Sequence, residues 1–130
     1  MDLNYQYAHN SHDESETKNG VSTAEALNAF EVFDWAGETE KANTLQKCSP
    51  TLSVITAPDI EFIWVSAYTE SNSIQFVSEC NFPGEVSSWF GLSKKQGIVN
   101  LHTQSFSAKQ AKAAVEFFVA RDYNSLRKLY

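Results

Sequence analysis

The sequence predicts a single α+β domain with N-terminal helices, an antiparallel meander of about four strands, and a C-terminal helix or helices packed on the sheet. Three patterns predict this fold: helical spacing after residue 21, β-rich segments between residues 51 and 106, and helical spacing again from residue 107. A chain of 130 residues is long enough for one domain that buries roughly two-thirds of its unfolded surface. We assign residues 21–130 to this domain.

Residues 1–20 are polar and charged and have almost no aliphatic side chains. Such a composition predicts a disordered or loosely attached acidic arm. His9 and His12 have the i, i+3 spacing of some metal ligands, but no cysteine lies near them in the sequence. The sequence therefore predicts no metal site in this arm.

The first helix is predicted to begin at Ser22, because Ser22 and Glu25 form a capping-box pattern. One helical face then carries apolar side chains, namely Ala26, Leu27, Phe30 and Phe33. Gly37 interrupts the pattern, and residues 38–48 are predicted to form a second short helix or an irregular turn.

Four β-rich segments form the predicted meander, at residues 51–56, 61–69, 73–80 and 96–106. The turn-forming stretches "APD" and "ESN" separate the first three. In the second segment, Trp64 and Tyr68 share one face, and Ile63 and Val65 share the other. Because both faces are largely apolar, we expect this segment to be a central strand.

The stretch "NFPGEVSSWFG", Asn81 to Gly91, is predicted to be a loop, yet it carries three aromatic rings. We expect Phe82 and Pro83 to pack under the edge of the sheet. Trp89 and Phe90 are adjacent, so in an extended segment their side chains point to opposite sides. One ring can then anchor in the core while the other contacts a partner, as exposed tryptophans at interfaces often do.

The last region is the clearest helical segment. Ser107 and Gln110 form a second capping-box pattern. The stripe that follows is apolar and consists of Ala111, Val115, Phe118 and Val119. A break at residues 122–124 predicts a final turn or short helix.

Charge is unevenly distributed along the chain. Residues 1–40 hold nine acidic residues against Lys18 alone, a net charge of −8, whereas residues 41–130 carry +2, giving −6 overall. Binding to nucleic-acid phosphates requires clustered lysine and arginine, so nucleic acid is not expected as a ligand. An acidic surface instead favours a basic protein partner, whose approach it accelerates.

The sequence predicts a cytoplasmic protein. No apolar run approaches the roughly 20 residues of a membrane helix, and the first residues lack the basic and apolar regions of a signal peptide. No membrane association is therefore expected. Cys48 and Cys80 lack C-x-x-C spacing, and a reduced interior is the natural environment for such thiols.

Motifs for enzymatic chemistry are missing from the sequence. It contains no glycine-rich phosphate loop, no H-E-x-x-H and no G-x-S-x-G. We therefore predict no catalytic residues, no cofactor and no metal. One alternative is a small enzyme in which Cys80 is the nucleophile and His102, on the next strand, is its base.

The stretches "PTLSVIT", "IWVSAY", "FPGEVSSWFGL" and "GIVNLHTQSFSAKQAKAAVEFFV" resemble small immunity proteins of bacterial polymorphic toxin systems. Those systems include contact-dependent inhibition and type VI secretion. The resemblance covers residues from about 50 to 130. It implies a non-enzymatic inhibitor that binds a cognate toxin domain and blocks its active site or its access to substrate.

Under this hypothesis the partner is a toxin protein, predicted to be basic, and acidic side chains form the face that attracts it. The predicted partner-binding residues are Glu31, Asp34, Glu38 and Glu40 as the charged face, with Trp89 and Phe90 as anchors. Another alternative, from a different class, is an adaptor or assembly subunit that forms a homodimer through "SSWFG".

Overall fold

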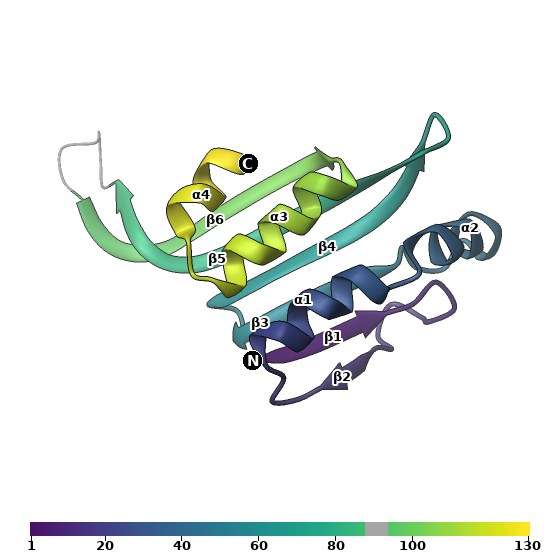
Figure 1. Cartoon of the computed structure of the whole chain (residues 1–130), viewed down its shortest axis with the longest axis horizontal. Coiled ribbons are helices and arrows are strands. Elements are labelled where there is room, and N and C mark those ends of the chain that lie inside the picture. Colours follow the sequence, from purple (N-terminus) through teal and green to yellow (C-terminus); the bar gives the residue numbers. More distant parts are fainter. Residues whose placement is uncertain (88–93) are drawn as a thin grey trace.

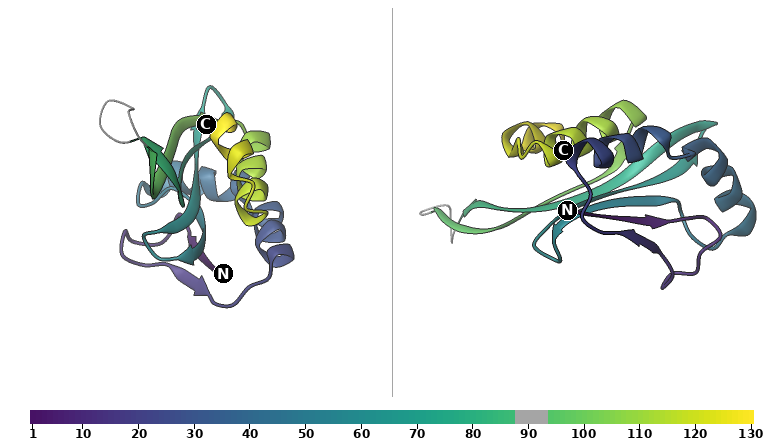
Figure 2. Two further views of the ribbon diagram at one scale, coloured as in Figure 1. Left: turned by 90° about the vertical axis from the view of Figure 1, so that its left-hand side faces the viewer. Right: turned by 60° about the horizontal axis from the view of Figure 1, so that its bottom comes forward.

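The computed structural model describes residues 1–87 and 94–130, which form an antiparallel sheet with helices on one face (Figures 1 and 2). The strands are β1 (Asp2–Gln6), β2 (Glu16–Lys18), β3 (Thr51–Ala57), β4 (Glu61–Glu70), β5 (Ser73–Ser87) and β6 (Lys94–Phe106). The helices are α1 (Thr23–Val32), α2 (Trp35–Leu45), α3 (Ala108–Val119) and α4 (Tyr123–Leu129). The predicted α+β class is confirmed.

The sheet has the order β2-β1-β3-β4-β5-β6, so the described residues add two strands to the four that the sequence predicted. Both additional strands lie in the segment that we predicted to be a disordered or loosely attached arm, and that prediction is wrong. Leu3 pairs with Lys18 on one side and with Val54 on the other, and only 1% of Leu3 is exposed. The segment belongs to the sheet.

A strand pattern explains this outcome. In residues 3–7, Leu3, Tyr5 and Tyr7 alternate with Asn4 and Gln6, which is the two-residue period of a strand with one buried face. At Tyr5 and Tyr7, aromatic rings take the positions in this pattern that aliphatic side chains usually take.

The meander β3-β4-β5-β6 follows the predicted order, but its last two strands are longer than expected. β5 continues to Ser87, so the first part of the predicted loop is strand. Its pairing with β4 ends at Asn81, whereas its pairing with β6 continues through Pro83. Phe82 is buried as predicted, but Pro83 is exposed, so the prediction that it packs under the sheet is wrong. Proline is tolerated at this position because one side of β5 has become a free edge there. Trp89 and Phe90 lie outside the residues that the structure describes.

The helix boundaries follow from local capping. Ser22 and Ser107 cap α1 and α3 as predicted, and at Ser107 both hydrogen bonds of the capping box are present. α1 ends at Val32 because Phe33 adopts an extended conformation, and Asp34 then caps α2 by accepting a hydrogen bond from the Gly37 N–H. Phe33 therefore leaves the helical face on which the sequence placed it.

β4 is a central strand, as predicted. Ile63, Val65 and Ala67 point into the core, whereas Trp64 and Tyr68 point to the opposite face, which we call the open face because none of the described helices lies on it (Figure 2). The helices supply the rest of the core, including Ala26, Ala29, Phe30, Ala111, Ala114, Val115, Phe118 and Leu126. Among the described helices, none is long and apolar enough to cross a membrane.

Candidate partner-binding site

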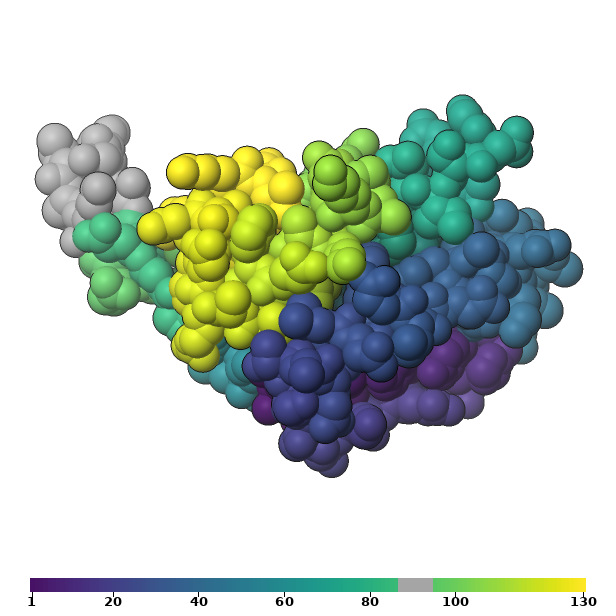
Figure 3. All heavy atoms as spheres, in the orientation of Figure 1, coloured from purple at the N-terminus to yellow at the C-terminus, as the bar shows by residue number. Residues whose placement is uncertain are grey.

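A wide hollow lies where β1, β2 and the α1–α2 junction meet. Its volume is about 610 Å³. In Figure 3 these elements, purple for the strands and blue for the helices, lie side by side. We call this hollow the aromatic–acidic groove, and its lining residues are Tyr5, Tyr7, His9, Glu16, Ala29, Val32, Phe33, Asp34, Glu38 and Lys41.

Three nearly parallel rings form the aromatic part of the groove. The Tyr7 and Phe33 ring centroids are 5.6 Å apart with 5° between their planes, and those of Tyr5 and Tyr7 are 6.0 Å apart with 4°. The His9 ring extends the series, 5.8 Å from Tyr7 and at 8° to it. The strand period places Tyr5 on the same face as Leu3, and the end of α1 positions Phe33 beside it.

The core supports this aromatic surface from behind. Phe33 contacts Trp35 at a centroid distance of 4.1 Å, and Trp35 contacts the buried Phe76 at 5.0 Å. The Trp35 indole Nε1–H donates a hydrogen bond of 3.0 Å to the Phe30 carbonyl. Because the rings are held by packing, a ligand that binds them orders few side chains, which favours affinity.

Three carboxylates line the groove beside the rings, those of Glu16, Asp34 and Glu38. The environments of the two glutamates differ. Glu38 is only 6% exposed, and its Oε1 accepts a hydrogen bond of 3.1 Å from the Ala8 N–H while its Oε2 pairs with Lys41 Nζ at 3.1 Å. Glu16 is exposed on β2. Burial raises the pKa of the Tyr7 hydroxyl, and the Glu16 carboxylate, Tyr5 and Glu38 raise it further. The groove is thus electronegative.

The structure brings two of the predicted partner-binding residues together in this groove, Asp34 and Glu38. Glu38 mainly holds the chain together, because it ties the segment after β1 to α2. Glu31 lies outside the groove and forms an ion pair with Lys112 of α3. Glu40 is exposed on α2, also outside the groove lining.

Sequence reasoning missed Tyr5, Tyr7 and Glu16 as site residues because it treated residues 1–20 as an arm. The signal was nevertheless present in the alternation of residues 3–7. Phe33 was interpreted only as a core residue of the first helix.

The alternative enzyme hypothesis required Cys80 and His102 to meet, and the structure places them on opposite faces of the sheet. Cys80 pairs with Leu101, whereas His102 pairs with Glu79. The Cys80 side chain is fully buried in the core, and burial, with a smaller contribution from Glu61, raises the pKa of its thiol to about 12. A thiol in this environment is a poor nucleophile.

Two smaller hollows flank Trp64 on the open face, with volumes of about 450 and 230 Å³. In the first, Cys48 Sγ lies 3.9 Å from His12 Nδ1. His9 lines the aromatic–acidic groove instead, so the two histidines do not share a site. Most other side chains around Trp64 are polar, including Ser53, Glu79 and His102, as is usual for the uncovered face of an antiparallel sheet.

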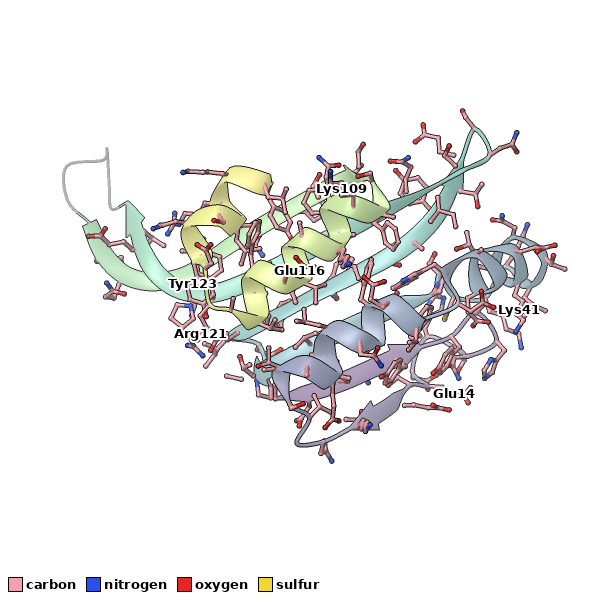
Figure 4. The ribbon with its side chains drawn as sticks, in the orientation of Figure 1. Glu14, Lys41, Lys109, Glu116, Arg121 and Tyr123 are labelled. Atoms are coloured by element: carbon pink, nitrogen blue, oxygen red, sulfur yellow. The ribbon has the colours of Figure 1, made fainter. Side chains whose placement is uncertain are left out.

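A second group of aromatic and charged side chains lies at the opposite end of the molecule, where α3 meets α4. We call it the Glu61 cluster, and its residues are Glu61, Phe82, Arg121, Tyr123 and Arg127. The Arg121 guanidinium pairs with Glu61 at 3.0 Å and lies 5.9 Å from the centre of the Tyr123 ring, and the Tyr123 hydroxyl donates to Glu61. Figure 4 shows Arg121 and Tyr123 here, far from Lys41 on α2.

The described residues contain no group of three or more histidine, cysteine, aspartate or glutamate side chains placed to hold a metal ion. No protein-family model, curated protein or solved structure matches this chain. The geometry of the chain itself is therefore the basis for the function proposed below.

Proposed function

We propose that this chain is a non-enzymatic binding protein of the immunity type, which acts in the cytoplasm by binding and neutralising a basic toxin domain. The single observation that carries the proposal is the aromatic–acidic groove. Its rings are held by the core, its edge carries exposed carboxylates, and it belongs to the part of the chain with a net charge of −8.

These properties match what a tight and fast protein inhibitor requires. Rigid aromatic side chains dominate the energy of many interfaces, while surrounding charges mainly increase the association rate and set the partner's orientation. An inhibitor of this kind needs no reactive group of its own. Occupying the toxin's active site or blocking its substrate is sufficient.

A co-purification experiment tests the proposal. We would attach an affinity tag to Tyr130 through a flexible linker, so that the groove stays untouched, and purify the protein from the cells that make it. Mass spectrometry would identify any companion present in near-stoichiometric amount. The matched control is the double variant Tyr7→Leu, Glu16→Gln, which removes one ring and one charge from the groove.

The expected companion is a basic domain of a larger secreted protein that binds the unaltered protein and is lost from the double variant. Co-expression should then protect cells from that domain. A companion whose harmful effect persists in the presence of this protein would contradict the proposal, as would a companion that is an acidic protein or nucleic acid.

A further inference from the structure

The Glu61 cluster and the aromatic–acidic groove are built from the same chemical parts. Each combines a tyrosine ring, a glutamate and further aromatic side chains. In the Glu61 cluster, the chain supplies an arginine that pairs with Glu61 and lies over the Tyr123 ring. Nearby, the Arg127 guanidinium lies 5.6 Å from the centre of the Phe82 ring. Both arrangements are cation–π contacts.

No arginine of the described residues lines the aromatic–acidic groove. Its one lysine is Lys41, and the Lys41 ammonium pairs with Glu38. Glu16 has no ion-pair or hydrogen-bond partner for its side chain among residues 1–87 and 94–130. A carboxylate beside half-buried rings is therefore available to a cation from outside the chain.

The shape of the groove favours a planar cation. The Tyr5, Tyr7 and Phe33 rings lie within 2–5° of one another, so they present parallel flat surfaces. A guanidinium group is flat, stacks on aromatic faces, and directs paired N–H donors toward a carboxylate in its plane. A lysine ammonium is compact and strongly hydrated, and it gains less from such a surface.

We propose that the aromatic–acidic groove binds an arginine side chain of the partner, with the guanidinium stacked on the Tyr7 and Phe33 rings and paired with Glu16. This inference rests on the proposed function for the identity of the partner. The arrangement repeats the contact of Arg121 with Tyr123 and Glu61, but with the arginine contributed by another molecule.

Short blocked peptides test the inference without the partner. We would titrate the full-length protein with acetyl-Gly-Arg-Gly-amide and follow its amide and aromatic NMR signals. Two matched peptides replace arginine with lysine or with citrulline, which keeps the shape of arginine but removes its charge. The arginine peptide should shift signals of Tyr5, Tyr7 and Phe33 with a dissociation constant on the order of 1–10 mM, as expected for one side chain.

Variants of the protein locate the contacts. Glu16→Gln should weaken binding of the arginine peptide roughly three- to tenfold, and Tyr7→Leu should weaken it about fivefold. The matched control is Glu116→Gln, which removes an exposed carboxylate from α3 and should leave the affinity unchanged. Urea unfolding of each variant would verify that it is folded.

Equal binding of the arginine and citrulline peptides would overturn the inference, as would signal shifts confined to another surface or an unchanged affinity in Glu16→Gln. Stronger binding of the lysine peptide would also overturn it. Failure of the peptide experiment alongside successful co-purification would refute only the arginine contact. Specific arginine binding without any neutralised companion would refute only the immunity function.

Discussion

The aromatic–acidic groove and the Glu61 cluster contain similar side chains, but the chain pairs the carboxylate of only one of them. In the Glu61 cluster the carboxylate is 10% exposed at its side chain and already has an arginine and a tyrosine hydroxyl as partners. In the groove, Glu16 is exposed, and the neighbouring Phe33 ring packs on Trp35 of the core. The same set of side chains therefore stabilises the fold where the chain itself supplies the arginine, and leaves an exposed carboxylate where it does not.

The greatest loss of stability is expected on removing the Phe82 ring from the Glu61 cluster. Phe82 is 1% exposed and stacks on Tyr123 with 4.3 Å between ring centroids. Phe82→Ala should lower the free energy of unfolding by about 3–5 kcal/mol, because it leaves a cavity in the core. Urea unfolding would measure this. Phe33→Ala should lower the free energy of unfolding clearly less, since Phe33 is half-buried. An equal loss in the two variants would show that the groove contributes to stability as much as the Glu61 cluster does.

The next largest effect is expected at the two glutamates. Glu61→Gln should destabilise the protein by about 2 kcal/mol, since it removes the ion pair with Arg121 and weakens the bond from Tyr123. Glu16→Gln should change stability by no more than about 0.5 kcal/mol, because Glu16 is a surface residue. The denaturation midpoints of both variants would show the contrast. A larger loss at Glu16 would mean that the groove is structural.

Alkaline pH should weaken the fold around Glu61. Burial raises the pKa of both the Cys80 thiol and the Tyr123 hydroxyl to about 12, with Glu61 contributing to each. A raised pKa in the folded state stabilises the protein at pH values below the ordinary pKa, and this contribution is lost as pH rises toward 12. Stability should therefore be constant up to about pH 8.5 and fall above pH 9.

The control for this pH profile is the variant Tyr123→Phe. Its stability should decrease less steeply above pH 10 than that of the unaltered protein. Tyr123 also packs on Phe82, and phenylalanine keeps that contact. The midpoint of urea unfolding at several pH values would provide the profile. A constant midpoint up to pH 11 would contradict the burial argument.

The smallest effect is expected from salt, and the quantity that it changes is the rate at which the proposed basic partner associates with the protein. Raising the salt concentration shortens the range of electrostatic attraction from about 10 Å at 0.1 M to about 3 Å at 1 M. Association of the basic partner should slow accordingly, and Glu16→Gln should reduce this dependence. Stopped-flow mixing would measure the association rates of the unaltered protein and of Glu16→Gln at each salt concentration. Association that does not depend on salt would argue against electrostatic attraction by this surface.

Local patterns predicted most of the fold because local chemistry determines it. Ser107 and Gln110 satisfy the first N–H groups of α3 within a few residues, and the alternation in β4 separates its two faces. The position of β1 could not be predicted in this way. Its pairing of Leu3 with Val54 depends on a contact between distant parts of the chain, and the side chains that alternate with Leu3 are the half-buried Tyr5 and Tyr7 rather than aliphatic residues.

The candidate site was predicted only in part for the same reason. Asp34 was identified from charge alone, but its neighbours Tyr5 and Tyr7 reach it only after β1 has joined β3. Glu38 was predicted to be a surface charge, and nothing in its local sequence reveals that the Ala8 N–H lies beside it. Charge composition identified the acidic region, and the fold determined which of its acids are accessible.

The pairing of β1 with β3 also has a consequence for biosynthesis. A ribosome releases the chain from its N-terminus, so Tyr5 and Tyr7 emerge well before Leu52 and Val54, the β3 residues against which β1 is held. Until then β1 lacks the strand that joins it to the rest of the sheet, so the groove is incomplete on the growing chain. If the groove binds as proposed above, binding cannot begin until β3 has been made, late in translation.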